Sequence, residues 1–253
     1  MSSVFLTSKL LPAPHGFSTR HGGVSVKPYD SMNLGEGGGD VPGAVEQNYA
    51  RLARAAGLAL EGLATVHQVH GNRVQRVSAR PPGAARCVGE ADALWTEEPG
   101  IWVGVRTADC VPVLIVDPER RRVAAIHSGW RGTRGRIVRE AVAALVAEGS
   151  CAHSLLVAVG PAIGPCCYRV SEELALEFTR AFGGQVVLRA SGEAGVSLDL
   201  PLAVRDTLLA SGVAGSHIDV MRRCTACEPE TFYSYRRDGS DAGRHLCFVG
   251  SGA

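Results

Sequence analysis

Three short segments place side chains that could bind a metal or act as nucleophiles where an apolar strand gives way to a turn. They are Thr65-Val-His-Gln-Val-His-Gly71, Arg106-Thr-Ala-Asp-Cys-Val-Pro112 and Ala124-Ala-Ile-His-Ser-Gly-Trp-Arg-Gly132. Turns beside rigid strands often carry sites, because the strand fixes the geometry and the turn gives access. The side chains of interest are therefore the imidazoles and the thiol within these segments.

His67 and His70 form an HxxH pair at the end of the first segment. The residues around them favour a strand, where side chains three residues apart point to opposite faces. Only one ring can then face a given site. His70 is the better candidate because Gly71 follows it, where the strand should end, and His67 is expected to be a partly buried histidine bonded to the backbone.

His70, Cys110 and His127 together suit Zn²⁺. Two imidazoles and a thiolate are zinc ligands, and three protein ligands leave a fourth position for water or substrate, as in catalytic zinc sites. The intervals of 40 and 17 residues match no zinc finger, so folding must bring the ligands together. Taken alone, Cys110 is equally typical of a small buried hydrophobic residue.

Further polar features have open interpretations. Arg20 and Arg131 lie beside glycine-containing turns and are candidate anion holders. Cys224-Thr-Ala-Cys227 is a CxxC with no second CxxC, which excludes a zinc ribbon and leaves a redox pair. The neighbouring Cys166 and Cys167 are expected to pack. The aromatic and arginine-rich segment 232–238 is either a nucleobase or phosphate contact, or a strand with solvated arginines.

The elements that must position these residues are strands and helices in irregular alternation. Apolar runs predict strands at Leu63–Val69, Ile101–Val105, Val111–Val116, Arg122–Ile126 and Leu155–Val159. Helical periodicity and capping residues predict helices at Val45–Leu58, at Gly135–Ala147, from Ser171 onward and at Pro201–Ala210. The glycine-dense segment 31–40 and the connector 80–86 are expected to be loops. We therefore predict one mixed α/β domain over residues 1–253.

Composition narrows the class of protein. The 253 residues include 26 Lys and Arg against 25 Asp and Glu, a balance that argues against nucleic-acid binding through a basic face. No apolar run approaches a membrane span, and the N-terminus lacks the pattern of a secretory signal, so we expect a cytoplasmic protein. Eight cysteines are too few for a disulfide scaffold. The oligomeric state is left open.

Several motifs in order resemble the YfiH/laccase-domain family, whose members are also called polyphenol oxidases, peptidoglycan editing factors or purine nucleoside phosphorylases. The resemblance runs from about residue 17 to 247. The motifs are Phe17-Ser-Thr-Arg20, Gly22-Gly-Val-Ser25, Asn33-Leu-Gly35, Gln68-Val-His-Gly71, Thr107-Ala-Asp-Cys-Val-Pro112, His127-Ser-Gly-Trp-Arg-Gly132, Gly160-Pro-Ala-Ile-Gly-Pro-Cys-Cys-Tyr168 and Phe232-Tyr-Ser-Tyr-Arg-Arg-Asp-Gly239.

The resemblance implies an α/β domain of layered, mixed β-sheets flanked by helices, with His70, Cys110 and His127 as zinc ligands. It also implies phosphorolysis of adenosine, inosine, guanosine and methylthioadenosine, together with adenosine deamination. The sequence departs from the family pattern at two positions. Gly37 stands where a loop histidine is usual, and Arg169 replaces the usual glutamate after Tyr168. Either change could alter specificity or rate.

The implied reactions assign further roles. In deamination, zinc lowers the pKa of its bound water toward about 7 for attack on C6 of adenine. Asp109 is the predicted proton carrier, on sequence proximity alone. In phosphorolysis, Arg20 or Arg131 would hold phosphate bidentately. The expected partners are purine nucleosides and phosphate.

Other functions compete with this expectation. Cys110 activated by His127 would make a metal-free hydrolase, and the zinc site could instead hydrolyse an amide of a peptidoglycan precursor. A purely structural zinc would need a fourth protein ligand, for which His67 is the first candidate. A multicopper oxidase is disfavoured because the chain has eight histidines and no HxH pair, although Cu²⁺ binds such donor sets in vitro whatever their role.

Overall fold

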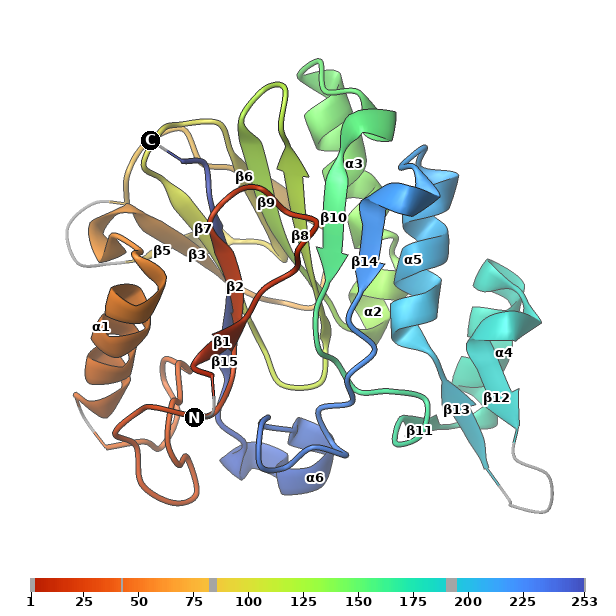
Figure 1. Cartoon of the computed structure of the whole chain (residues 1–253). Coiled ribbons are helices and arrows are strands. Elements are labelled where there is room, and N and C mark those ends of the chain that lie inside the picture. Colours follow the sequence, from red (N-terminus) through yellow and green to blue (C-terminus); the bar gives the residue numbers. More distant parts are fainter. Residues whose placement is uncertain (1–2, 42, 82–85, 190–194, 253) are drawn as a thin grey trace.

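Two six-stranded mixed sheets form the centre of the molecule (Figure 1). The computed structural model describes residues 3–41, 43–81, 86–189 and 195–252. The first sheet has the strand order β1 (Phe5–Leu6), β2 (His15–Ser18), β15 (His245–Gly250), β7 (Trp102–Thr107), β3 (Leu63–His67) and β5 (Cys87–Glu90). The second has the order β14 (Ile218–Val220), β10 (Leu156–Val159), β8 (Val111–Asp117), β9 (Arg122–Ser128), β6 (Ala93–Thr96) and β4 (Val74–Arg76).

Alternating apolar side chains on the long strands determine the layers. Along β8, Val113 and Ile115 face one way and Leu114 and Val116 the other, because successive side chains of a strand point to opposite faces. The first pair packs against α3 (Ile137–Ala147) and α5 (Leu200–Ala210). The second pair meets the first sheet, so the two sheets share a core in which both faces of β8 are buried.

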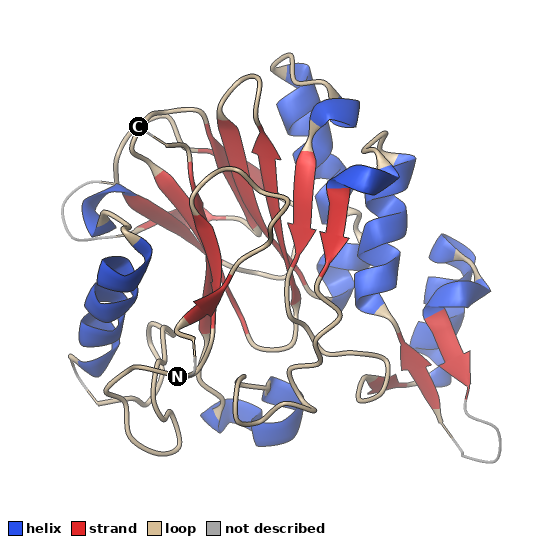
Figure 2. Cartoon of the chain, in the orientation of Figure 1, coloured by secondary structure: helices blue, strands red, loops and turns tan. Residues whose placement is uncertain are grey.

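The remaining helices cover the outer faces and edges. Helix α1 (Ala44–Ala56) buries an apolar stripe on the outer face of the first sheet, and Figure 2 shows it on the side opposite α3 and α5. The resulting order is helix, sheet, sheet, helices. A small sheet of β11 (Arg169–Val170), β13 (Val196–Leu198) and β12 (Val187–Arg189) packs with α4 (Glu172–Phe182) beside this sandwich (Figure 1).

Short helices and caps complete the framework. Helix α2 (Trp130–Arg134) directly follows β9, and α6 (Tyr235–Asp238) precedes β15. Ser171 caps α4 by accepting a hydrogen bond from the Leu174 amide, and Asp199 caps α5 in the same way through the Leu202 amide. Among the described residues, no helix is long and apolar enough to cross a membrane.

The mixed α/β class with layered sheets and flanking helices is confirmed, as are the predicted strands and helices, with shifted ends. β3 stops at His67 rather than at Val69. The predicted helix 135–147 starts only at Ile137, because Arg136 has a left-handed backbone, with φ of 61°. Segment 31–40 is a loop, and residues 82–85 of the connector 80–86 lie outside the described part of the chain.

Candidate active site

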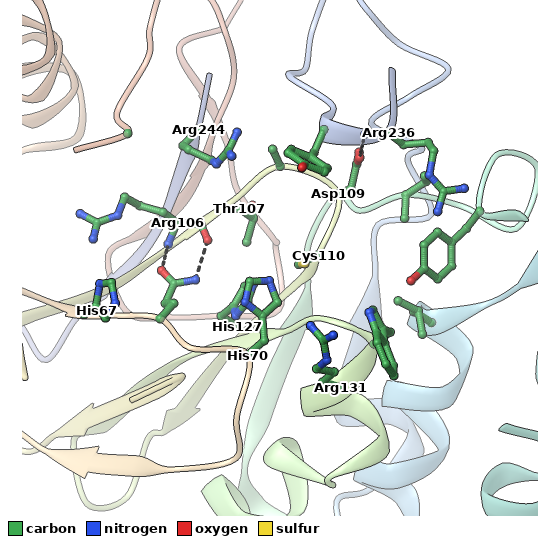
Figure 3. A pocket seen from close by; sticks show the side chains of 18 of the residues that line it. His67, His70, Arg106, Thr107, Asp109, Cys110, His127, Arg131, Arg236 and Arg244 are labelled. Carbon is green, nitrogen blue, oxygen red and sulfur yellow. Dashed lines mark hydrogen bonds between the residues drawn. The ribbon is translucent and has the colours of Figure 1, made fainter. Parts of the chain in front are cut away.

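A cavity of about 640 Å³ lies where β7 ends, β8 begins and β9 passes into α2 (Figure 3). Its size is typical of sites for small molecules. The predicted residues His70, Cys110, His127, Asp109 and Arg131 all line it. The loop Asp109–Cys110 crosses from the first sheet to the second, so the cavity sits at a junction between the two sheets.

His70, Cys110 and His127 converge at this cavity. One ligand atom from each lies within 4.8 Å of the others, and the two imidazole centroids are 4.8 Å apart with the rings nearly perpendicular. The pairing of Pro112 with His127 across β8 and β9 brings Cys110 beside His127. His70 comes from the turn after β3 and has a φ of 61°, a strained conformation for a histidine.

Asp92, which the sequence reasoning missed, holds two of these ligands in place. Its fully buried carboxylate lies 2.8 Å from His127 Nδ1, which leaves Nε2 of that ring for the cavity side. The same carboxylate accepts hydrogen bonds from the backbone amides of Val69 (3.2 Å), His70 (2.9 Å) and Gly71 (2.7 Å). Burial raises the pKa of Asp92, but these hydrogen bonds, led by that of His127, outweigh burial and lower it.

The three ligand groups also set one another's charge. Burial raises the pKa of the Cys110 thiol, but the neighbouring His127 charge and hydrogen bonds from both imidazoles lower it to about 6. Burial lowers the pKa of His127, and the Cys110 thiolate and Asp92 outweigh this and raise it to about 9. Without a metal, the pair is therefore a thiolate and an imidazolium near neutral pH.

The donor set fits a zinc ion with one open position. Two imidazole nitrogens and one thiolate match a three-ligand catalytic zinc site, in which water or substrate takes the fourth position. No fourth His, Cys, Asp or Glu from the described residues joins this group. His67, the predicted candidate for a structural fourth ligand, lines the cavity as an exposed side chain outside the group, so it is neither a ligand nor partly buried.

Gly129 has no side chain, which leaves room for the side chains of Cys110 and His70 beside it. A Cβ atom at this position would lie 3.0 Å from Cys110 Sγ and 3.0 Å from His70 Cδ2. These contacts are tighter than ordinary packing, so any larger residue would push the thiol and the ring apart. The first glycine of the His-Ser-Gly-Trp-Arg-Gly motif is thus explained by close approach.

The structure does not favour the predicted proton-carrier role of Asp109. Its Oδ1 accepts a hydrogen bond from Thr225 Oγ1, and its Oδ2 accepts bonds from Ser234 Oγ at 3.0 Å and the Arg236 amide at 2.6 Å. These bonds engage both carboxylate oxygens, and Asp109 has a left-handed φ of 86°. Asp109 therefore links the β7–β8 turn to the segment that precedes β15.

Of the two predicted anion-binding arginines, one lines the cavity and the other does not. Arg131 lines the cavity, and its guanidinium stacks on Trp130 at 4.5 Å from the ring centroid. Arg20 does not line it: its guanidinium donates to the carbonyl oxygens of Asp30 (2.9 Å) and Pro229 (2.7 Å). Its Nη2 also lies 3.4 Å from Asp30 Oδ1, so protein acceptors engage the guanidinium outside the cavity and the prediction for Arg20 is corrected.

Three more arginines line the cavity: sequence reasoning missed Arg106 and Arg244, whereas Arg236 lies in the segment that it singled out. Arg106 pairs with Glu36 at 2.8 Å, and Arg244 donates to the backbone carbonyls of Ala242 and Gly243. Arg236, from the segment 232–238, lies over Tyr168 at 4.9 Å and donates to the Arg169 carbonyl at 2.8 Å. The segment therefore contributes to the cavity as a short helix, not as a strand.

The two departures from the family pattern lie at the margin of the cavity. Glu36 lines it, whereas the adjacent Gly37 does not, and a Cβ at Gly37 would meet open space. Arg169 presents its carbonyl to the cavity residue Arg236. Neither position lines the cavity, and each is next to or bonded to a residue that does.

Comparison with known proteins identifies the family of the chain. A family model described as multi-copper polyphenol oxidoreductase laccase matches residues 14–251. The purine nucleoside phosphorylase YlmD of Geobacillus stearothermophilus is 41% identical over 243 residues, which cover 93% of this chain and 89% of that protein. A purine nucleoside phosphorylase of Deinococcus radiodurans is 42% identical over 240 residues, which cover 95% and 90%.

A solved structure supports the same relationship. The crystal structure of YlmD from Geobacillus stearothermophilus superposes with a TM-score of 0.90 at 36% identity, covering 99% of both chains. The resemblance predicted from the ordered motifs is thereby confirmed. The chain belongs to the multi-copper polyphenol oxidoreductase laccase family, the laccase-like group that includes YlmD and YfiH.

Proposed function

We propose that this chain is a zinc-dependent purine nucleoside phosphorylase acting on adenosine, inosine, guanosine and methylthioadenosine. The observation that carries the proposal is one cavity lined both by His70, Cys110 and His127, three residues that could hold a metal ion, and by the cationic side chain of Arg131. The names of the similar proteins from Geobacillus and Deinococcus support the same reaction class.

Arg131 is the proposed phosphate holder. Stacking on Trp130 uses the face of the guanidinium and leaves its N–H edge for a bidentate contact with an anion. The guanidinium groups of Arg106, Arg236 and Arg244 are already bound to protein acceptors. Glu36 offsets the charge of Arg106, whereas Arg236 and Arg244 add positive charge to the cavity, which favours phosphate without fixing its orientation.

The reaction follows from placing phosphate beside the nucleoside. An oxygen of hydrogen phosphate forms a bond to C1′ while the glycosidic bond breaks, and the phosphate proton ends on the purine. The products are the free purine and ribose 1-phosphate, or 5-methylthioribose 1-phosphate from methylthioadenosine. Held by His70, Cys110 and His127, Zn²⁺ would supply a Lewis acid at one end of the cavity. Trp130, Tyr168 and Tyr235 offer aromatic surface for the purine ring.

Adenosine deamination belongs to the same proposal. Water takes the place of phosphate and attacks C6 of adenine, with ammonia as the leaving group. The feature that favours it is the open fourth position of the ligand set. The proposal assigns no proton carrier, since both carboxylate oxygens of Asp109 are engaged.

Product analysis tests the proposal. Adenosine and inosine are incubated with and without phosphate, using the wild-type chain, Cys110→Ala, and Cys151→Ala as an exposed control outside the cavity. Inosine should yield ribose 1-phosphate and hypoxanthine only with phosphate, and adenosine should also release ammonia. Cys110→Ala should lower both activities by more than about 100-fold, because a catalytic metal contributes several kcal/mol. Arg131→Gln should raise the KM for phosphate.

Three results would contradict the proposal. Loss of only one activity in Cys110→Ala would refute a shared site. Hydrolysis retained by the zinc-depleted protein would favour the Cys110 thiol acting with His127 as the nucleophile and base. Amino-acid release from a peptidoglycan precursor, without turnover of nucleosides, would favour the amidohydrolase alternative.

A further inference from the structure

Four cysteines outside the cavity's ion site converge at a second place. Cys166 and Cys167 lie in the turn before β11, and Cys224 and Cys227 lie in the turn after β14. Their four sulfurs all lie within 4.8 Å of one another, and Cys227 Sγ is 3.5 Å from Cys166 Sγ and 3.3 Å from Cys167 Sγ. All four are free thiols.

The convergence and the exposure of Cys166 argue against packing as the role of this pair, of which Cys167 is half-buried. Cys166 and Cys227 are exposed, and burying a small apolar side chain is not their role. A zinc ribbon was excluded because the sequence has no second CxxC. The adjacent pair supplies the two missing sulfurs instead, from a turn some sixty positions earlier in the chain.

We propose that Cys166, Cys167, Cys224 and Cys227 hold a second Zn²⁺ in a closed, structural site. Zinc–sulfur bonds of about 2.3 Å in a tetrahedron place the sulfurs about 3.8 Å apart, close to the separations here. A tetrahedral set of four soft thiolates is typical of zinc. Four protein ligands fill the coordination sphere, which distinguishes this site from the three-ligand set in the cavity.

The backbone around the sulfurs fits such a site. The Gly164 amide donates to Cys224 Sγ at 3.2 Å, as backbone amides commonly do to thiolate ligands. A Cβ at Gly164 would lie 3.2 Å from Cys166 Sγ and 3.3 Å from Cys224 Cβ, so glycine lets the two turns approach. The exposed sulfurs of Cys166 and Cys227 give the ion an entry path.

Two arginines bond to the backbone of the cysteine turns, and one of them, Arg237, also pairs with Asp238 at 2.7 Å. Four thiolates and one Zn²⁺ carry a net charge of −2, which nearby cations would offset. The Arg236 guanidinium lies 3.4 Å from the Cys167 carbonyl oxygen. That of Arg237 donates to the carbonyls of Thr225 at 3.1 Å and Ala226 at 3.3 Å, both between the CxxC cysteines.

The site would clamp one wall of the cavity. Ala162 and Cys224 already form an isolated β-bridge between the two segments. Ile163 and Tyr168 flank the first cysteine pair and line the cavity, and Thr225, between the second pair, bonds to Asp109. An ion at this place would therefore fix the position of cavity residues without touching substrate.

Zinc counting tests the inference on the full chain, expressed with Zn²⁺ as the supplied metal and measured by native mass spectrometry and elemental analysis. We expect two zinc ions per wild-type chain, and one in Cys224→Ser/Cys227→Ser and in Cys110→Ala. Cys151→Ser, which changes an exposed cysteine elsewhere, should retain two. Unchanged zinc in the double variant, iron in its place, or a disulfide among the four cysteines would overturn the inference.

Cobalt substitution keeps the test decisive if the double variant does not fold. In Cys110→Ala loaded with Co²⁺, the remaining ion should show the intense thiolate-to-cobalt absorption of four sulfur ligands in a tetrahedral field. Octahedral cobalt, or absorption matching fewer thiolates, would refute the site. This outcome does not depend on phosphorolysis, because Cys110→Ala already disables the proposed reaction while leaving the four cysteines intact.

Discussion

Asp92 controls the cavity site through hydrogen bonds rather than through contact with a substrate. One carboxylate orients the His127 ring and anchors the amides of the turn that carries His70. Both histidine ligands therefore depend on a residue that is itself fully buried. Residues in this position are positioning residues, and their effect appears first in metal affinity.

Asp92→Asn should lower zinc affinity and kcat/KM by about 10- to 100-fold, because the amide nitrogen cannot accept the bonds that the carboxylate accepts. Chelator competition gives the affinity, and steady-state kinetics give kcat/KM. Asp219→Asn is the control, since Asp219 lies on β14, away from the cavity, and accepts a hydrogen bond from the Ser8 hydroxyl. A loss of stability in Asp92→Asn with unchanged zinc affinity would assign Asp92 a role in folding alone.

The charge state of Cys110 gives a pH prediction for the zinc-depleted chain. Its pKa of about 6 lies below the ordinary thiol value of 9.0, so the thiolate stabilises the fold at high pH and this contribution is lost as pH falls through 6. Carboxymethylation of Cys110, followed by peptide mapping, should reach its half-maximal rate near pH 6. Cys110→Ser serves as the control for other cysteines.

Added Zn²⁺ should block that labelling, because the metal would occupy the sulfur. A midpoint near the ordinary thiol value would show that His127 does not hold the thiolate.

The three proposed ligands could be named from the sequence, and Asp92 could not. His70, Cys110 and His127 are uncommon residue types at strand ends, and the donor chemistry of zinc selects them together. Asp92 is a single carboxylate between two alanines, and nothing in that pattern marks it. Its importance comes from the pairing of β6 with β9, which places it beside His127.

At the scale of elements, the junction of β9 and α2 is the most constrained part of the site. Gly129→Ala should lower zinc affinity and activity while leaving the fold intact, since the added methyl meets Cys110 Sγ and His70 Cδ2 rather than backbone. Chelator competition and circular dichroism measure the two effects. Gly184→Ala, where a Cβ meets open space, should change neither. Normal zinc binding by Gly129→Ala would show that the ligands relax around a methyl group.

The elements found from the sequence are those whose signal is local. Strands β8 and β9 are buried along their whole length and appear as continuous apolar runs. β15 was missed. It pairs with β2 and β7, which lie far from it in the sequence, and this pairing could not be read from the sequence. The left-handed Arg136 was missed because arginine carries no signal for that conformation.

The whole molecule shows why the second cluster of cysteines escaped prediction. The two cysteine turns lie about sixty residues apart, and their meeting depends on the parallel pairing of β10 with β14. The spacing of residues in the sequence predicts local structure. It does not predict which distant turns will meet when strands pair in a sheet. The layered fold was predictable because apolar periodicity fixes faces; the order of strands within each sheet was not.

The proposed ion site in the cavity would draw its ligands from both sheets. His70 follows β3 of the first sheet, while Cys110 and His127 border β8 and β9 of the second. No fragment containing one sheet alone could assemble it. An ion that binds only when the two sheets are packed together stabilises the native state by mass action. A higher concentration of free zinc should therefore oppose the separation of the two sheets by raising its free-energy cost.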